Sequence, residues 1–128
     1  MLETTGEGNR EQKEKSYKSN SRGGGEKVKP AVPPFVQQIA DRDPELYEAV
    51  VKVIEVAMTP GALDAKTKTL INLALDAYIG SERGVMVLAN RARELGATEE
   101  EIKETLRIAY YVAGMKTLAT SNNAFPQS

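Results

Sequence analysis

Residues 64–80 read DAKTKTLINLALDAYIG, and their apolar side chains are distributed nearly all the way round a helix. Asp64 has the short, oxygen-bearing side chain that accepts hydrogen bonds at a helix N-cap. Gly80 suits the left-handed conformation in which many helices end. The pattern therefore predicts a helix over residues 65–79. A helix without a clean polar face is typical of a surrounded position, so we expect this helix at the centre of the protein.

Further helices are predicted on either side of this central segment. Upstream, Asp43 and the proline that follows it form a helix start, and a single apolar stripe continues from there to about Met58. Downstream, Ser81 is placed to cap a helix whose broad apolar face ends at Leu95. A short helix is also expected over residues 35–40, from the spacing of its apolar residues.

The last long helix is predicted to begin at residues 98–101, a capping box with two further acids in its first turn. We expect Gly114 inside this helix or just past its end, with residues 115–119 as a last short helix. Its inward-facing residues are expected to be Ile102, Thr105, Leu106, Ala109, Tyr110, Val112 and Ala113. No stretch alternates with period two, so the sequence predicts an all-α fold, a small bundle of about five to six helices.

The chain divides into a polar N-terminal stretch and one region rich in apolar residues. Residues 1–30 contain few large apolar side chains to offset the entropy of ordering, so we expect a disordered N-terminal tail there. Residues 31–128 are enough for one helical domain, and the 128 residues of the chain are too few for two. The tail has a net charge of +2 and residues 31–128 a net charge of −3, so neither favours nucleic acid.

The composition removes several kinds of chemistry, because the chain contains no cysteine and no histidine. Thiolate nucleophiles, disulfides, iron–sulfur clusters and thiol-based zinc sites are excluded, and the commonest general base is missing. Chemistry would have to rely on carboxylates, Arg, Lys, Tyr, hydroxyls or the backbone, and we predict no cofactor and no metal site.

The chain has no apolar secretory segment and no window approaching the roughly 18 apolar residues of a membrane span, so we expect a cytoplasmic protein without a membrane partner.

Two separated motifs carry a family resemblance. The first covers residues 60–71, and the second covers residues 81–102 and ends in Leu-Gly-Ala-Thr-Glu-Glu-Glu-Ile; an Ala-Gly-Met piece follows at residues 113–115. In these residues the chain resembles the carboxymuconolactone decarboxylase family, which includes the alkylhydroperoxidase D-like proteins. The resemblance extends over residues 45–120 and implies a helical bundle of the alkylhydroperoxidase D-like type.

The same resemblance locates the positions that are reactive in other family members. In the peroxidatic branch a Glu, a Cys-x-x-Cys pair and a His correspond to Thr69, Ser81, Gly84 and Leu88 of this chain. None of these can form a thiolate or relay a proton near neutral pH, so thiol peroxidase activity is excluded. The branch that gives the family its name decarboxylates a γ-lactone and keeps a His where Leu88 stands. A decarboxylase-like reaction here would need cations and an acid, for which the candidates are Arg83, Arg91, Arg107, and Tyr110 or Tyr111.

Asp76 interrupts the most apolar helix and is a catalytic candidate with Arg83 and Tyr110, because a buried carboxylate is costly unless it is paired or used. Its structural alternatives are an ion pair with Arg83, Arg91 or a neighbouring subunit, or exposure on a narrow polar edge. Residues 81–84 open a helix whose free N–H groups favour an anion, and an ordinary N-cap turn is the alternative. The predicted ligand-binding set, for a small anionic ligand, is Thr69, Ser81, Gly84, Leu88 and Arg91.

Apolar helix faces that one subunit cannot cover lead us to expect a homo-oligomer, with a tight monomer as the alternative. Three functions are compatible with these patterns: an oligomeric protein that binds a small molecule or is catalytically degenerate, a lyase-type enzyme on a small carboxylated substrate, and a structural scaffold. A ligand-sized cleft in which Arg83, Arg91 and Asp76 converge would favour the first two. A cleft plugged by Leu88 and Met86 would favour the scaffold.

Overall fold

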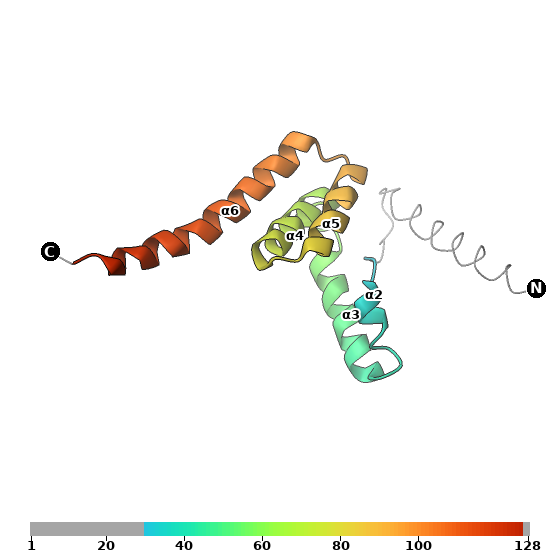
Figure 1. The fold of residues 1–128 in the computed structure, drawn as a ribbon. Coiled ribbons are helices and arrows are strands. Elements are labelled where there is room, and N and C mark those ends of the chain that lie inside the picture. Colours follow the sequence, from blue (N-terminus) through green and yellow to red (C-terminus); the bar gives the residue numbers. More distant parts are fainter. Residues whose placement is uncertain (1–29, 127–128) are drawn as a thin grey trace, which may run out of the picture. The chain divides into compact units, whose positions relative to one another are not determined.

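The computed structural model describes residues 30–126, and these residues form helices and no strand (Figure 1). The all-α prediction is therefore confirmed. The helices are α2 (Pro34–Gln37), α3 (Pro44–Met58), α4 (Ala65–Ile79), α5 (Glu82–Glu94) and α6 (Glu99–Ser121), followed by the 3-10 helix η1 (Asn122–Ala124). The tail predicted for residues 1–30 lies outside the described residues, apart from Pro30.

Local capping chemistry fixes where three of the helices begin. The Asp43 carboxylate accepts a hydrogen bond from the backbone N–H of Leu46 at 3.0 Å, so α3 starts where its sequence predicts. The Asp64 carboxylate accepts from the N–H of Thr67 at 2.7 Å and starts α4 in the same way. The Thr98 hydroxyl accepts from an N–H in the first turn of α6 at 3.1 Å. These predicted N-caps are confirmed.

The start of α5 differs from the prediction. Ser81 occupies the N-cap position, but its side chain accepts no capping hydrogen bond. Its backbone N–H donates to the carbonyl of Asp76 at 2.9 Å, because Gly80 ends α4 in a left-handed conformation with φ of 82°. The prediction that the Ser81 side chain caps α5 is therefore wrong. Ser81 instead contributes its backbone N–H to the tight turn that ends α4.

The chain separates into two compact units, with the division after Thr59. In the first unit, α2 buries Val36, and α3 has no buried residue along its length. The predicted apolar stripe of α3 is thus present in the sequence but remains half-exposed or exposed in one chain.

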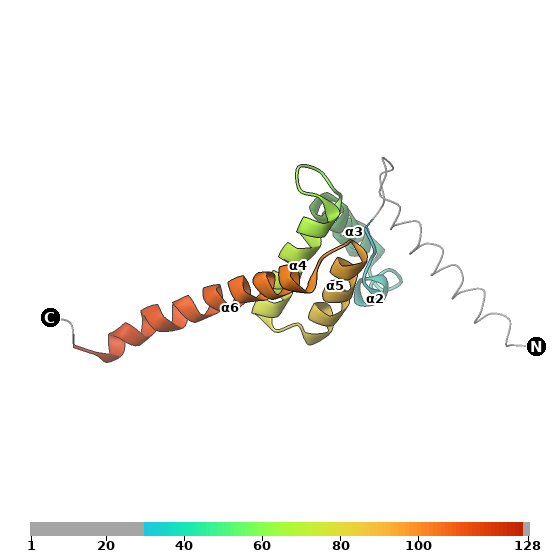
Figure 2. The ribbon, with the colours of Figure 1, turned by 90° about the horizontal axis from the view of Figure 1, so that it is seen from above.

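The second unit has a small core at the junction of α4, α5 and α6 (Figure 2). Its buried members are Leu73, Ala92, Ala97 and Ile102. Partly buried side chains pack around them: Leu70, Val85, Leu88, Ala89 and Leu106. Because α5 and α6 each contact α4 far more extensively than they contact each other, α4 is the central helix of this unit.

The expectation that α4 is surrounded on all sides is wrong for one chain. Only Thr69 and Leu73 of this helix are buried. Large apolar side chains on its other side remain exposed, namely Ile71, Leu75, Tyr78 and Ile79. The two neighbouring helices, α5 and α6, cover one side of α4 and leave its opposite side exposed.

Helix α6 also differs from its prediction. It runs without a break through Gly114, so residues 115–119 are part of the same helix and not a separate one. Ile102 and Ala109 are buried as expected, but Tyr110, Val112 and Ala113 are exposed and were wrongly placed inward. The reason is length, because the second half of α6 extends past the ends of α4 and α5 (Figures 1 and 2). No helix within residues 30–126 is long and apolar enough to cross a membrane.

Candidate functional site

The seam between α4 and α5 holds most of the residues that the sequence predicted as a binding site. On α4, Thr69 and Leu73 are buried, and Asp76 follows them on the same face at the spacing of successive helical turns. On α5, Gly84 lies against Asp76 and Leu88 packs against the core around Leu73. The structure therefore brings the predicted positions together along one helix–helix contact.

The hydroxyl group at the first of these positions is already used by its own helix. Thr69 is buried, and its Oγ1 donates a hydrogen bond to the carbonyl of Ala65 at 2.8 Å. Within residues 30–126, every buried side-chain nitrogen or oxygen has a hydrogen-bond partner. Thr69 thus offers no unsatisfied group to a ligand in this chain.

The position that the family resemblance assigns to a relay histidine is occupied by an apolar side chain, Leu88. Leu88 is partly buried and packs against the core cluster that includes Leu73 and Ala92. An aliphatic side chain carries no proton and binds no polar group, so this part of the seam contributes packing rather than chemistry. Met86, which would fill a cleft together with Leu88 in a scaffold protein, is exposed and takes no part in that packing.

Asp76, Ser81 and Gly84 meet where α4 passes into α5. A Cβ built on Gly84 would collide with Asp76 Oδ2 and would lie 2.7 Å from Ser81 Oγ. The absence of a side chain at residue 84 therefore allows the Asp76 carboxylate to reach the first turn of α5. A helix N-terminus attracts negative charge, and here a carboxylate of the chain itself is close to it.

The predicted cationic partners do not join this cluster. Among residues 30–126, Asp76 forms no ion pair with Arg83 or Arg91, so those two structural alternatives for it are not realised. Arg91 Nη1 instead lies 3.5 Å from Glu94 Oε2, and Arg83 is exposed. Eight residues separate the two arginines on α5, or about 12 Å along the axis at 1.5 Å per residue. They do not converge on one point.

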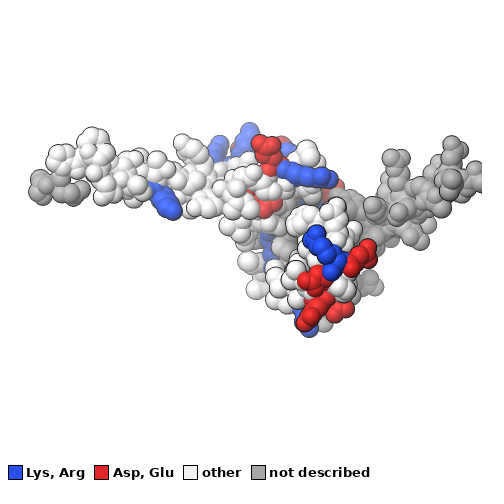
Figure 3. All heavy atoms as spheres, turned by 60° about the horizontal axis from the view of Figure 1, so that its bottom comes forward, with Lys and Arg blue, Asp and Glu red and all other residues white. Residues whose placement is uncertain are grey.

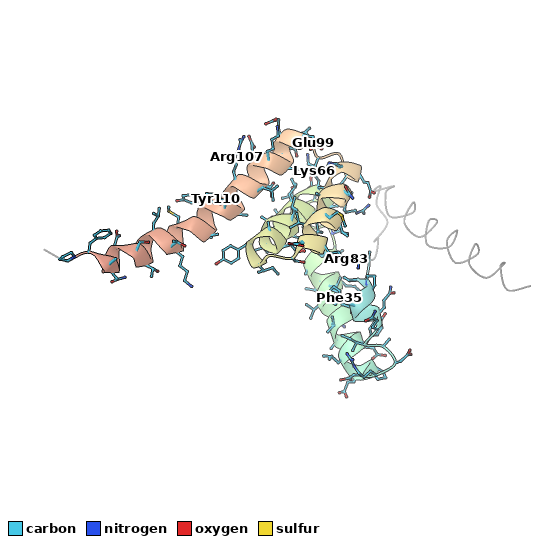
Figure 4. The ribbon with its side chains drawn as sticks, viewed as in Figure 1. Phe35, Lys66, Arg83, Glu99, Arg107 and Tyr110 are labelled. Carbon is cyan, nitrogen blue, oxygen red and sulfur yellow. The ribbon has the colours of Figure 1, made fainter. Side chains whose placement is uncertain are left out.

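A second group of candidate residues lies on α6. A hollow of about 430 Å³ is lined by Lys103, Leu106, Arg107 and Tyr110, which recur at i, i+3, i+4 and i+7 on one helix. Figure 4 shows Arg107 and Tyr110 projecting from that helix, and Tyr110 is 81% exposed. No second element closes this hollow in the described chain. Sequence reasoning missed Lys103 and Leu106, although their helical spacing was a usable signal.

Ion pairs at the start of α6 tie it to the neighbouring helices. Lys66 Nζ lies 2.9 Å from Glu101 Oε2, and Arg93 Nε lies 2.6 Å from Glu99 Oε1. The hydrogen bond between the partners lowers the pKa of Glu101 below its ordinary value and raises that of Lys66. Arg93 likewise lowers the pKa of Glu99. Two ion pairs thus link the first turn of α6 to Lys66 on α4 and to Arg93 on α5. Within residues 30–126, no three carboxylates come together in a way that could hold a metal ion.

Comparison with known proteins agrees with this helical architecture. The carboxymuconolactone decarboxylase family model matches residues 44–125, and the chain belongs to that family. Two archaeal relatives come from Methanocaldococcus jannaschii. The uncharacterized protein MJ1511 is 34% identical over 62% of this chain and 75% of its own length, and the uncharacterized protein MJ0742 is 32% identical over 60% and 75%. No solved structure matches the chain.

Proposed function

We propose that this chain is a catalytically degenerate, homo-oligomeric member of the family, whose helices serve assembly rather than reaction chemistry. The observation that carries the proposal is the packing of Leu88 into the core at the position of the relay histidine. Thr69, with its hydroxyl bonded inside α4, supports the same conclusion. A satisfied hydroxyl at Thr69 and an aliphatic side chain at Leu88 suit helix packing, and neither supplies the acid, base or thiolate that the reactive positions of the family require.

The exposed apolar surface supports the oligomeric part of the proposal. In one chain, large apolar side chains are open on α3, α4 and α6, including Val56, Ile79, Ile108 and Tyr111. Exposed large apolar side chains in such number are typical of helices that another chain covers. Assembly of several copies would remove them from water, and each covered side chain would favour the assembled state.

The arrangement of the charged candidates argues against a small-anion site in the seam. Arg83 and Arg91 are two helical turns apart on α5, and neither pairs with Asp76 among the described residues. An anion at the first turn of α5 would meet the Asp76 carboxylate beside Gly84. Repulsion between like charges disfavours that position.

A thermal-shift screen against small carboxylates, lactones and phosphates tests the proposal, because any ligand of the native state raises its stability by mass action. The expected result is an oligomer by light scattering and no reproducible shift. A shift that Arg83→Ala or Asp76→Ala abolishes would overturn the degenerate assignment. Arg42→Ala is the matched control, since Arg42 is also an exposed arginine but lies outside α4 and α5.

The hollow on α6 favours a second candidate function, a lyase-type reaction on a small carboxylated substrate. Arg107 would hold a carboxylate, together with Lys103 once it leaves its ion pair with Glu100 at 3.0 Å, and the Tyr110 hydroxyl would give a proton. In such a step the bond between carbon and carboxylate breaks, carbon dioxide leaves, and the electron pair left on carbon takes that proton.

Release of carbon dioxide from carboxylated γ-lactones tests this second candidate. Turnover that falls at least about tenfold in both Arg107→Ala and Tyr110→Phe would support it, since one lost transition-state contact commonly has that effect. Arg42→Ala should leave the rate unchanged. No release by the wild-type protein would leave the degenerate oligomer as the function.

A further inference from the structure

The second half of α6 carries an apolar stripe that its own unit does not cover. Ile108, Tyr111, Met115 and Leu118 are 62%, 61%, 40% and 60% exposed. Their spacing of i, i+3, i+7 and i+10 repeats every 3.5 residues, which is the pattern of a seam between two packed helices. The stripe therefore has the geometry of a helix–helix interface and not of scattered surface residues.

Charge is nearly absent from this part of the chain. Between Ile108 and Pro126, Lys116 is the only charged residue. Figure 3 accordingly shows the projecting part of α6 as largely uncharged. A helix that faces water on all sides normally carries charged residues along its exposed surface, so this composition indicates that another element covers the stripe.

The stripe faces away from the core of its own unit. Ala109 is buried on the side of α6 that packs against α4, and Tyr111 lies two residues further along. Two residues correspond to about 200° of rotation on a helix. The same helix thus presents one face to its own core and the opposite face outward.

We infer that the α6 helix of a second copy of this chain covers the stripe in an antiparallel arrangement, with Ile108 opposite Leu118 and Tyr111 opposite Met115. This inference rests on the proposed homo-oligomer and names the surface through which two copies meet. The shared lack of charge allows the segment to pair with itself without like-charge repulsion.

Glu104 continues the stripe toward the N-terminus and decides whether the two α6 helices run parallel or antiparallel. Glu104 lies one turn before Ile108 on the same line and is exposed. A parallel pair would place the two Glu104 carboxylates against each other, which is unfavourable. In the antiparallel register Glu104 stands opposite Asn122, whose amide group can donate a hydrogen bond to a carboxylate.

The exposed area of the stripe lies at the lower end of what a specific interface needs. The four stripe side chains and the neighbouring Val112 expose roughly 500 Å² per copy, taking about 150–250 Å² for each large side chain. Complete burial of these side chains in two copies would remove about 1,000 Å² from water, which is the lower limit for a biological interface.

Thiol cross-linking tests the inference cleanly, because the chain has no cysteine and one introduced cysteine is unique. In the antiparallel register the two copies of residue 115 are about 6 Å apart along the axis, and those of residue 118 about 15 Å, at 1.5 Å per residue. Met115→Cys should therefore give a cross-linked dimer with a short bis-maleimide, and Leu118→Cys should not. Ala113→Cys is the matched control. Ala113 is exposed and lies at nearly the same height along the axis of α6 as Met115, but on the opposite side of the helix.

The outcomes separate the possibilities. Cross-linking of Leu118→Cys as strong as that of Met115→Cys would overturn the antiparallel arrangement, and cross-linking through Ala113→Cys alone would overturn the assignment of the face. A wild-type protein that is monomeric at every concentration would refute the proposed oligomer itself. An oligomer that none of these cysteines links would refute only the role of α6.

A charge in the stripe provides an independent measurement on the intact chain. Leu118→Glu should weaken self-association at least about tenfold, with the helical circular dichroism retained because Leu118 lies beyond the buried core. Ala113→Glu places the same charge on the other side of α6 and should leave association unchanged. Loss of helical signal in Leu118→Glu without a change of mass would mean that the chain's own residues cover the stripe, which contradicts the inference.

Discussion

The carboxylate of Asp76 lies against Gly84, in the space that a Cβ on residue 84 would occupy. Ser81 Oγ is 2.7 Å from the same point, so two side chains converge on the first turn of α5. Gly84 has no positive φ, unlike Gly80 and Gly96. Glycine is therefore needed at this position for the close approach of Asp76 and not for an unusual backbone conformation.

Gly84→Ala should lower the free energy of unfolding by about 1–2 kcal/mol, because overpacking costs more than the better helix propensity of alanine returns. Urea denaturation at fixed protein concentration measures this change. Asp76→Ala in the same chain should recover most of the loss, since it removes the atoms that collide. Gly61→Ala, where a Cβ meets nothing within 4 Å, should change little. Equal stability of Gly84→Ala and the wild type would contradict the contact.

Leu88→His should destabilise the second unit without creating an activity. The substitution places a polar ring against the apolar cluster around Leu73, and we expect a loss of about 2–3 kcal/mol. Met86→His, at an exposed position on the same helix, should cost less than about 0.5 kcal/mol. Both changes are measured by urea denaturation, and peroxide consumption should stay at background because no thiol is present. A Leu88→His protein as stable as Met86→His would show that Leu88 is not packed.

Stability should fall on acidification through the ion pairs at the start of α6. The hydrogen bond from Lys66 lowers the pKa of Glu101 from its ordinary value of 4.5. A group whose pKa is lowered by folding contributes its stabilisation above that ordinary value, and the contribution is lost as the pH falls through the folded value.

Glu101→Gln removes that titration, so its urea midpoint should change less between pH 6 and pH 3 than the wild-type midpoint does. Glu48→Gln is the control, because Glu48 is exposed on α3 and forms no ion pair among the described residues. Identical pH profiles for the wild type and Glu101→Gln would exclude the Lys66 pair as a source of stability.

Local signals in the sequence were sufficient for most helix boundaries. Asp43, Asp64 and Thr98 cap their helices as predicted, because a cap depends on residues within one turn of it. These local signals did not indicate which element covers each apolar helix face. Tyr110 belongs to an apolar pattern but is exposed, since periodicity identifies a face and not the element packed against it.

The candidate site was predictable only as a set of positions. The family motif located Thr69, Gly84 and Leu88. The structure places Gly84 and Leu88 of α5 against α4, and Thr69 is buried on the same face of α4 as Leu73. The contact between Asp76 and Gly84 could not be foreseen, because it depends on how α4 and α5 pack after the turn at Gly80. The hollow around Arg107 was missed as a unit because its four residues were judged singly rather than by their shared face.

The continuity of α6 yields the last prediction. Gly114 was expected inside this helix or just past its end, and the structure places it inside, with the helix continuing to Ser121. Glycine costs only about 1 kcal/mol relative to alanine in a helix interior. A Cβ on Gly114 would meet nothing within 4 Å in one chain. Gly114→Ala should therefore raise the free energy of unfolding by about 0.5–1 kcal/mol.

Urea denaturation and the mass in solution should be measured together for this variant. Gly96→Ala is the contrasting change, because Gly96 has φ of 94° and alanine there should destabilise the protein. A stability gain in Gly114→Ala with unchanged mass would support a continuous helix in solution. Lower stability accompanied by weaker self-association would mean that Gly114 lies at a close helix crossing between copies, which would move the contact from the stripe of Ile108 and Leu118 toward the face that carries Gly114.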